Sequence, residues 1–360
     1  WRPWINTIMS KFKINSITDR SGYCGPVISG VSTNNSTGCM IIPAGPTEFR
    51  GGRGRAIAAG GRVSPSNQTT IDVLDIATIG NSQDFGDMST RCGHSGAVSS
   101  STRGVVHVTF TPASTYTSTL EYITISSGGG SNDFGDRTVN TIMSKHTSGN
   151  NTRGVFGGGR TAPNASITTI DFVTIASTGN ASTFGSLRKA FDSGAGNIQS
   201  PTRGIFAGGY FFGAYTVPTK DIDFITFATK GNSVRFGDLF TGRYRFNGCS
   251  GSTRGVFMGG RYTSSQPNTI SSMDIMDYIT LSTEGNAQDF GNLTQARGMN
   301  VCASSLTRGL CMGGGQPANS NVIDYITFST TGNATDFGDL TQARQDITGG
   351  FSDVHGGLER

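Results

Sequence analysis

The stretch "TTGNATDFGDLTQAR" at residues 330–344 decides the fold, because the chain repeats it. Nearly the same sequence returns at 283–297 as "TEGNAQDFGNLTQAR", and the tetrapeptide "DFGD" occurs again at 84–87 and 133–136. A motif that recurs along one chain marks a structural unit that is built several times. The first task is therefore to find the full repeat and the structure it predicts.

Three landmarks recur six times, at intervals of about 50 residues from residue 51 onwards. The first is an arginine followed by glycine that opens an apolar run: Arg53, Arg103, Arg153, Arg203, Arg254 and Arg308. The second is an acid inside a run typical of a strand, such as "TIDFVTI": Asp72, Glu121, Asp171, Asp223, Asp277 and Asp324. The third is a phenylalanine followed by glycine: Phe85, Phe134, Phe184, Phe236, Phe290 and Phe337.

Each repeat contains four segments with the composition of short strands. "TRGVFGGG" (152–159), "TTIDFVTIAS" (168–177) and "ASTFGSL" (181–187) are followed by a run of small residues such as "NVCASS" (300–305). No segment has a sustained helical period of hydrophobic residues. Four-stranded units repeated at this interval are typical of a β-propeller. The sequence predicts an all-β protein with a six-bladed propeller over residues 51–360.

Residues 1–50 lack the landmarks, although "GPVISGVST" and "GCMIIPAG" have the composition of short strands. We expect a short β-rich extension that serves as an attachment segment, with a seventh blade as the alternative. Met9 has the sequence context of a natural start, so residues 1–8 are expected to be an upstream extension. At the other end, "QDITGGFSDVHGG" (345–357) follows the sixth repeat, and the first repeat has no small-residue strand before it. This predicts that the C-terminal segment supplies the inner strand of the first blade, which removes the open edges of the ring.

Composition excludes several classes of function. The net charge is +4, but the basic residues are spread over the repeats and not clustered, so we expect no nucleic-acid partner. No apolar run is long enough to span a bilayer, which predicts no membrane insertion. Six cysteines without a CxxC pair and four scattered histidines predict reduced thiols, no metal site and no cofactor.

Catalysis is not expected either. The magnesium-binding Asp-Phe-Gly of protein kinases occurs once per domain, beside an HRD motif and a strand lysine that are absent here. Thr183 and Arg235 also replace its aspartate in two repeats. "GGRGR" at 51–55 lacks the Gly-Lys-Ser/Thr ending of a phosphate loop. The chain is therefore expected to be non-enzymatic.

The repeated acids and the repeated Arg-Gly arginines invite one shared explanation. We expect each acid to pair with an Arg-Gly arginine, because blades must partly bury these charges and buried charges need partners. The alternative is a charged ring around the axis that binds calcium or an anion. One acid per strand falls short of the oxygen cluster that calcium prefers.

Spacing within the repeat predicts the binding face. From acid to Phe the interval is 13 residues in every repeat, and from Phe to the next arginine it is 18 or 19. From arginine to acid it varies between 16 and 23, so length variation falls in the loop after the glycine-ended strand. Equivalent loops of a propeller emerge on one face, where function is commonly placed. The longest, 208–221 and 259–274, carry side chains suited to a sugar or a protein partner: Tyr210, Phe211, Phe212, Tyr215, Arg261 and Tyr262. The alternative is that these side chains pack the loops onto their own blades.

The glycine-ended strand, the aromatic strand and the "xLxxAR" ending resemble the kelch repeat, although Phe stands where kelch has Trp. "RGVVHVT" at 103–109 departs from it, because it has no diglycine. Phrases such as "IDYIT…TTGNATDFGDLT" (323–341) resemble virion structural proteins of tailed phages, notably those that infect marine cyanobacteria. The resemblance implies a non-enzymatic virion protein of a tail, fibre or capsid surface. It would be mounted on other virion proteins through residues 1–50, would present loops to a host surface glycan or a protein, and could self-associate. A cellular kelch-like interaction module or a lectin is the alternative.

Overall fold

The computed structural model describes residues 32–34, 39–41, 54–109, 115–210, 218–263, 270–315 and 318–354. The chain divides into two compact units, residues 1–49 and residues 50–360. In the first unit, β1 (Ser32–Asn34) and β2 (Cys39–Ile41) form an antiparallel pair. The other described strands all belong to the second unit.

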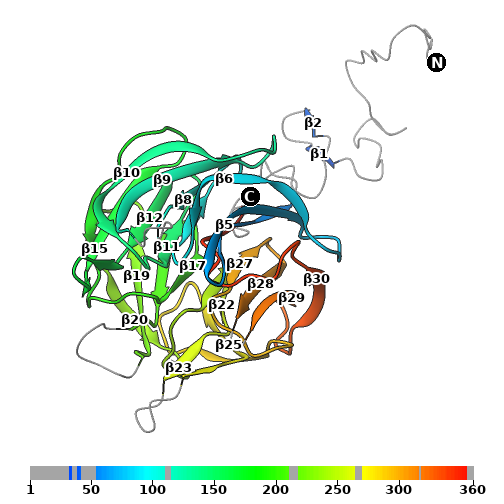
Figure 1. Cartoon of the computed structure of the whole chain (residues 1–360). Helices are drawn as coiled ribbons and strands as arrows, with labels where there is room; N and C mark the ends of the chain where they lie inside the picture. Colours follow the sequence, from blue (N-terminus) through cyan, green and yellow to red (C-terminus); the bar gives the residue numbers. More distant parts are fainter. Residues whose placement is uncertain are drawn as a thin grey trace, which may run out of the picture. The chain divides into compact units, whose positions relative to one another are not determined.

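The second unit is a six-bladed β-propeller, as predicted (Figure 1). Listed from the inner to the outer strand, blade 1 consists of β31 (Gly349–Ser352), β3 (Arg55–Ala59), β5 (Ser66–Asp75) and β6 (Gln83–Cys92). Blade 2 consists of β7 (Ala97–Ser99), β8 (Arg103–His107), β9 (Thr117–Thr124) and β10 (Asn132–Thr141). Blade 3 consists of β11 (His146–Gly149), β12 (Arg153–Gly157), β15 (Thr169–Thr174) and β16 (Ser182–Ser186).

Blade 4 consists of β17 (Ala195–Gln199), β18 (Arg203–Ala207), β19 (Asp221–Thr226) and β20 (Val234–Asp238). Blade 5 consists of β21 (Asn247–Ser250), β22 (Arg254–Met258), β25 (Ile275–Thr280) and β26 (Gln288–Asn292). Blade 6 consists of β27 (Val301–Ser304), β28 (Arg308–Gly315), β29 (Asn319–Thr327) and β30 (Thr335–Asp339). Short additional strands are β4 (Arg62–Val63), β13 (Arg160–Thr161), β14 (Ala165–Ser166), β23 (Arg261–Thr263) and β24 (Ile270–Ser272).

Within each blade, side chains are smaller in the strand nearest the propeller axis and larger in the strands farther out. The inner strands converge on one another, and a Cβ atom added to Gly350 would lie 2.6 Å from the Cβ of Val301. Small residues therefore predominate in these strands, as in β21 (NGCS) and β27 (VCAS). Farther out, apolar side chains of adjacent blades meet, as Phe337 of blade 6 does in one cluster with Leu74 of blade 1. Burial of this apolar surface between blades stabilises the ring.

The C-terminal segment closes the ring, which confirms the prediction. Strand β31 pairs antiparallel with β3, with Phe351 opposite Ile57. The Oδ1 atom of Asp353 accepts hydrogen bonds from the backbone N–H groups of Gly54 and Arg55, at 3.0 and 2.8 Å. Blade 1 thus combines the last strand of the described residues with three strands from the first repeat.

The repeated Phe-Gly pairs join each blade to the next through a turn glycine, which asparagine follows at every interface but that of blades 1 and 2. The N–H of Gly80 donates to the carbonyl of Phe337 at 2.9 Å, and the Asn81 side chain accepts from the N–H of Asp339 at 3.0 Å. The turn glycines donate to the Phe carbonyl of the preceding blade at all six interfaces: Gly80, Gly129, Gly179, Gly231, Gly285 and Gly332. The aspartates before Phe are exposed, as at Asp336. The motif that resembles a kinase sequence is therefore an inter-blade contact.

Candidate binding site at the mouth of the propeller

The repeated acids form buried contacts between blades, but not with the predicted arginines. Each of five acids pairs with an arginine that lies in the outer strand of the preceding blade (Arg137) or follows it (the other four). These pairs are Asp72–Arg344 (2.8 Å), Asp171–Arg137 (2.9 Å), Asp223–Arg188 (3.0 Å), Asp277–Arg243 (2.7 Å) and Asp324–Arg297 (3.1 Å). The sixth acid, Glu121, accepts hydrogen bonds from the hydroxyls of Ser89 and Ser131 instead. The acids are structural, and the expectation that they pair with Arg-Gly arginines is wrong.

The Arg-Gly arginines have another role, because strand register separates them from the acids. Arg103 lies opposite Thr124, three residues along β9 from Glu121, which is about 10 Å away in a strand. Its guanidinium stacks on Tyr122 at 4.3 Å and donates to the carbonyl of Ile175 in blade 3 at 3.2 Å. In blade 1 the equivalent residue is Arg55, which donates to the Ile125 carbonyl at 2.8 Å. Arg53, the predicted member, lies outside the described residues.

The axis is surrounded by a different set of residues, one before each inner strand. We call them the axial ring: His94, Met143, Ser193, Arg245, Met299 and Asp346. All six have φ between 49° and 61°, a conformation that non-glycine residues rarely adopt. Backbone hydrogen bonds join neighbours, such as Arg245 N–H to the Ser193 carbonyl at 2.6 Å. Unlike the structural landmarks, the axial ring differs in residue type from blade to blade. Backbone strain at positions where the fold does not fix the residue type is typical of functional sites.

The axis is blocked below the axial ring. Strand β17 has a register shift between Ala195 and Ile198, and Asn197 within it has a φ of 63°. Its side-chain amide donates to the carbonyls of Cys302 at 2.9 Å and Gly350 at 3.1 Å, which belong to blades 6 and 1. Side chains of the axial ring therefore border a mouth that is closed from below by Asn197.

A pocket of about 300 Å³ opens at this mouth, beside blades 3, 4 and 5. Its wall combines the residues that follow the paired glycines, Arg160, Tyr210 and Arg261, with Tyr244 and the axial-ring residue Arg245. The rings of Tyr210 and Tyr244 lie 5.5 Å apart. We call this the mouth pocket.

The paired glycines bring these side chains inward. Gly208 has a φ of 60°, and a Cβ there would lie 2.5 Å from the carbonyl oxygen of Arg243, so only glycine fits the turn. The residue after the pair then forms a bridge with the residue before the axial ring. Such bridges are Arg62–Gln345, Ile142–Arg160, Asp192–Tyr210, Tyr244–Arg261 and Gly298–Gly315. The described beginnings of the variable loops thus lie at the same mouth.

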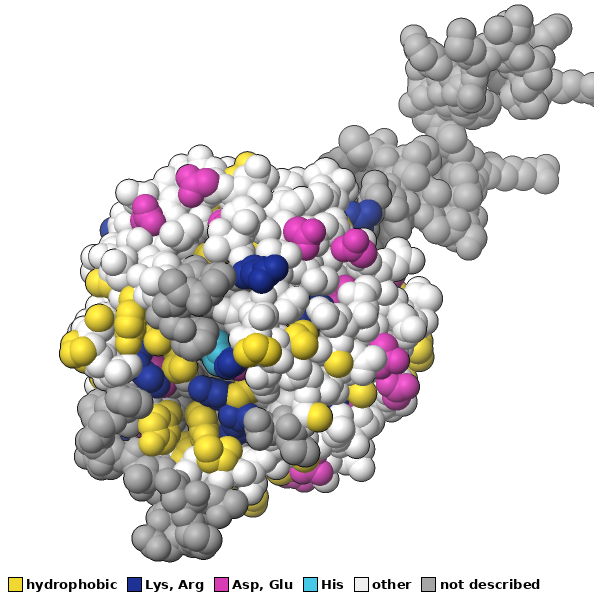
Figure 2. Space-filling view, in the orientation of Figure 1, with side chains coloured by type: hydrophobic (Ala, Val, Ile, Leu, Met, Phe, Trp, Pro, Cys, Tyr) yellow, Lys and Arg dark blue, Asp and Glu magenta, His cyan; other side chains and the backbone are white. Residues whose placement is uncertain are grey.

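Positive charge exceeds negative charge at the mouth. Lys145 and Arg261 are 3% and 5% exposed, and Arg245 lies close enough to lower the pKa of both. Burial lowers the pKa of Lys145 to about 8 and that of Arg261 to about 10. The nearby carboxylate, Asp346, is paired with His94 at 3.0 Å, and its pKa is lowered by His94, Arg245 and Lys145 against the opposing effect of burial. Figure 2 shows lysine and arginine side chains, with a histidine among them, near the middle of this face.

Several polar atoms here have no hydrogen-bond partner within the described residues. The donors are Nζ of Lys145 and the Nε and Nη2 atoms of Arg261, and the acceptors are Oδ1 of Asp192 and the two carboxylate oxygens of Asp346. The Nη1 of Arg245 contacts the sulfur of Met299 at 3.9 Å. Arg160, in contrast, is paired with Asp192 at 3.0 Å. Arginines of the structural ion pairs also have N–H groups without an acceptor, such as Nε of Arg344, but each of those arginines has a carboxylate within 3.1 Å. Among the described residues, Lys145 and Arg261 form no such ion pair.

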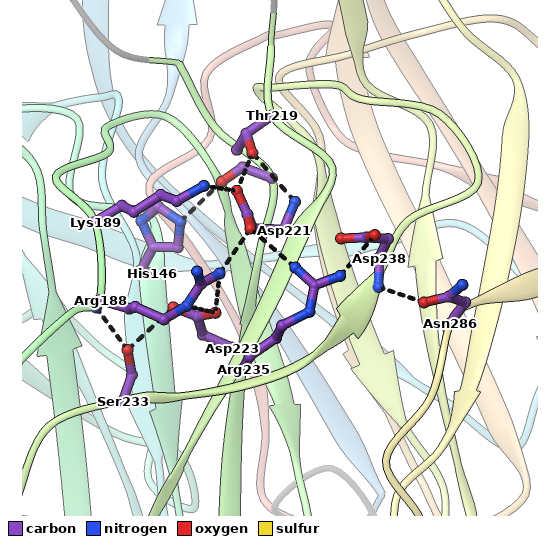
Figure 3. Close-up of polar contacts among 11 residues, drawn as sticks. His146, Arg188, Lys189, Thr219, Asp221, Asp223, Ser233, Arg235, Asp238 and Asn286 are labelled. Carbon is purple, nitrogen blue, oxygen red and sulfur yellow. Dashed lines mark hydrogen bonds and ion pairs between the residues drawn. The ribbon is translucent and has the colours of Figure 1, made fainter.

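A second cluster of charges, between blades 3 and 4, is balanced (Figure 3). Asp221 accepts from Arg188 at 2.6 Å and Lys189 at 2.9 Å, and Arg235 approaches both Asp221 and Asp238. Burial would raise the pKa of Asp221, but hydrogen bonds from Thr219, Lys189 and Arg188 lower it to about 2. Each cation has a carboxylate partner, so this cluster is a structural contact between blades 3 and 4.

The structure brings some of the sequence-predicted binding residues together. Tyr210 and Arg261 line the mouth pocket, whereas Tyr262 is half-buried on β23 and is not part of the wall. Phe211, Phe212 and Tyr215 lie outside the described residues. The sequence interpretation missed Lys145 and Arg245. The only signal for them was their place just before an inner strand, where residue type varies between repeats.

No group of three or more histidine, cysteine or acidic side chains in the described residues could hold a metal ion. Cys92, Cys249, Cys302 and Cys311 are buried free thiols, and burial raises the pKa of Cys92 to about 12. The described part of the chain contains no helix long and apolar enough to cross a membrane.

Neither a protein-family model nor a curated protein matches the sequence.

Proposed function

We propose that the protein is a non-enzymatic binding propeller that recognises its ligand at the mouth pocket. The observation that carries this proposal is the contrast between repeated and varied positions. Residues that join blades recur from repeat to repeat, whereas the axial-ring position and the position before it, which supply Arg245 and Tyr244 to the pocket, vary between blades. The position after the paired glycines is tyrosine at Tyr210, whereas it is arginine in blades 1, 3 and 5. A rigid scaffold with varied residues at one mouth is the usual design of a binding site.

The chemistry of the pocket favours binding over catalysis. Its wall presents guanidinium groups and phenol rings, side chains that are enriched where proteins contact partners. A nucleophilic mechanism needs a hydroxyl or thiol within hydrogen-bond reach of a base. Of the two aliphatic hydroxyls that line the pocket, Oγ of Ser193 lies 3.4 Å from the sulfur of Met143 and Oγ1 of Thr263 donates to the Tyr244 hydroxyl at 3.2 Å, so neither contacts a base.

We place this binding propeller on the particle of a tailed phage, mounted through residues 1–50 on other virion proteins. The resemblance of its repeat phrases to such virion proteins supports this setting. The ligand would be a host surface glycan or another protein of the particle. Mass spectrometry of purified particles tests the setting, because a cellular interaction module would be missing from them.

Competition for host adsorption tests the binding face. Purified protein added to host cells should reduce particle adsorption, and the variant Tyr210→Ser should compete at least tenfold less well. Phe240→Ser is the matched control, because Phe240 is 67% exposed and is not part of the pocket wall. Equal competition by Tyr210→Ser and the control, with both proteins folded, would refute a role for this face in adsorption.

A further inference from the structure

We infer that the mouth pocket binds an oxyanion carried on a sugar ring, that is, an acidic saccharide. The inference rests on the proposed function for the binding face and names the chemical class of its ligand. It stands on the balance of charge, on the free donors and on the shape of the pocket.

The charge balance comes first. Three cations, Lys145, Arg245 and Arg261, interact at the mouth with one carboxylate, Asp346. The other carboxylate there, Asp192, is paired with Arg160 at 3.0 Å. Asp346 also contacts His94, but burial lowers the pKa of that imidazole, so two of the three cations lack a counter-charge. Elsewhere in this protein the buried arginines of the blade interfaces each have their own acid, as Arg344 has Asp72. Burying charges without partners is unfavourable by several kcal/mol per ion. A bound anion would remove this imbalance.

The free donors show what the anion would contact. A guanidinium binds a carboxylate or sulfate through two parallel N–H groups. Arg261 has Nε and Nη2 without acceptors among the described residues, and these two atoms form one edge of its fork. Lys145 adds an ammonium group with no acceptor. Arg261 and Arg245 belong to the pocket wall, and Lys145 is close enough to both for their charges to lower its pKa.

The shape indicates that the anion is attached to a ring. A volume of about 300 Å³ exceeds a free sulfate or phosphate and suits one sugar residue. Tyr210 and Tyr244 offer aromatic surface beside the cations, and Ile270 adds an apolar contact. Aromatic rings provide flat apolar area with a polar edge, which suits the face of a sugar. Cations next to such a surface fit a sugar that carries a carboxylate or a sulfate.

Isothermal titration calorimetry of the full chain tests the inference. Glucuronate should bind, and glucose, which lacks the carboxylate, should bind at least tenfold more weakly. Inorganic sulfate and glucose 6-sulfate show which anionic group the pocket prefers. If glucose 6-sulfate binds at least tenfold more tightly than both inorganic sulfate and glucuronate, the preferred group is a sulfate carried on a sugar. Equal binding of glucose and the acidic sugars would overturn the inference, as would binding of inorganic sulfate alone.

Two variants show whether binding uses the mouth. Arg261→Met should weaken glucuronate binding at least tenfold, whereas Arg235→Met, which changes net charge equally in the balanced cluster, should leave it unchanged. Lys145→Met should weaken binding and raise the melting temperature of the ligand-free protein, because it removes a buried charge without a partner. A structural lysine would give the opposite change in stability. Unchanged affinity in both mouth variants would refute the site.

This result can be separated from the proposed function. If no anion binds but Tyr210→Ser still fails to compete for adsorption, the binding face stands and the ligand class is wrong. If glucuronate binds at the mouth but neither Tyr210→Ser nor Arg261→Met affects adsorption, the pocket is an acidic-sugar site and the proposed role of the face in adsorption is wrong.

Discussion

The carboxylate of Asp72 lies 2.8 Å from the guanidinium of Arg344, and both side chains are fully buried. Asp72 belongs to the first repeat and Arg344 to the last, so this ion pair joins the two ends of the propeller. Arg344 also donates to the carbonyl of Ala58 at 3.0 Å, which fixes it on β3. The same pair at the interface between blades 2 and 3, Asp171 with Arg137, needs no ring closure. Comparison of the two pairs therefore measures how much closure of the ring contributes to the free energy of unfolding.

Removal of one partner should be strongly destabilising. Asp72→Asn and Asp171→Asn should each lower the free energy of unfolding by about 3–5 kcal/mol, because each leaves an arginine buried without its counter-charge. Urea unfolding followed by circular dichroism measures the change. Asp238→Asn serves as the control, since its pair with Arg235 is half exposed and such pairs contribute little. Loss of less than 1 kcal/mol in both buried variants would contradict the structural role.

Deletion of residues 345–360 should abolish cooperative unfolding. The deletion removes β31, exposes the inner edge of β3 and leaves Gly54 and Arg55 without the Asp353 carboxylate. Phe351→Ala retains the strand and removes only its buried ring, so it should remain cooperative and lose about 3–5 kcal/mol. Calorimetry distinguishes the two outcomes. A truncated chain that melts like the wild type would show that β31 is dispensable.

Gly338→Ala should be destabilising at the joint between blades 6 and 1. Gly338 has a φ of 144°, and an added Cβ would lie 2.5 Å from the carbonyl oxygen of Gly80. The alanine would force the Phe-Gly contact apart, so we expect a loss of a few kcal/mol. Gly80→Ala is the matched control, because its added Cβ would meet no atom within 4 Å. Similar melting temperatures for the two variants would argue against close packing at this joint.

Lys145 should make stability depend on pH above neutrality. Its pKa is about 8 in the folded protein, where burial and the charges of Arg245 and Arg261 outweigh Asp346, and 10.5 is the ordinary value. Between these values the unfolded chain binds the extra proton, so the free energy of unfolding rises with pH, by on the order of 3 kcal/mol in all. The deprotonation of Cys302, which is also near, acts in the opposite direction.

The difference between wild type and Lys145→Met isolates this contribution. Lys145→Met should be more stable than wild type at pH 7, and the gap should close as pH rises from 8 to 10.5. Denaturant unfolding at several pH values measures it. A constant gap over this range would show that Lys145 keeps its ordinary pKa in the folded protein.

The sequence by itself determined the number of blades, the order of strands and the closure of the ring. These follow from local patterns: six copies of Arg-Gly, acid and Phe-Gly count the blades, and the missing strand before Arg53 matches the spare segment 345–357. It also pointed to the loops after the paired glycines, because length varies only there. Such features can be read along one chain without knowing what lies beside it.

Only the tertiary structure decided which charges meet. Asp171 takes Arg137 from the preceding blade, and not Arg153 from its own, because strand register places Arg153 opposite Thr174, three residues away. The mouth pocket depends still more on the fold. Lys145 precedes the inner strand of blade 3, whereas Arg245 and Arg261 belong to blade 5. They meet because the ring brings the start of each inner strand, and the turn after the paired glycines, to one axis. The sequence does not show which charged side chains lack a counter-charge, because an oppositely charged partner can come from any blade.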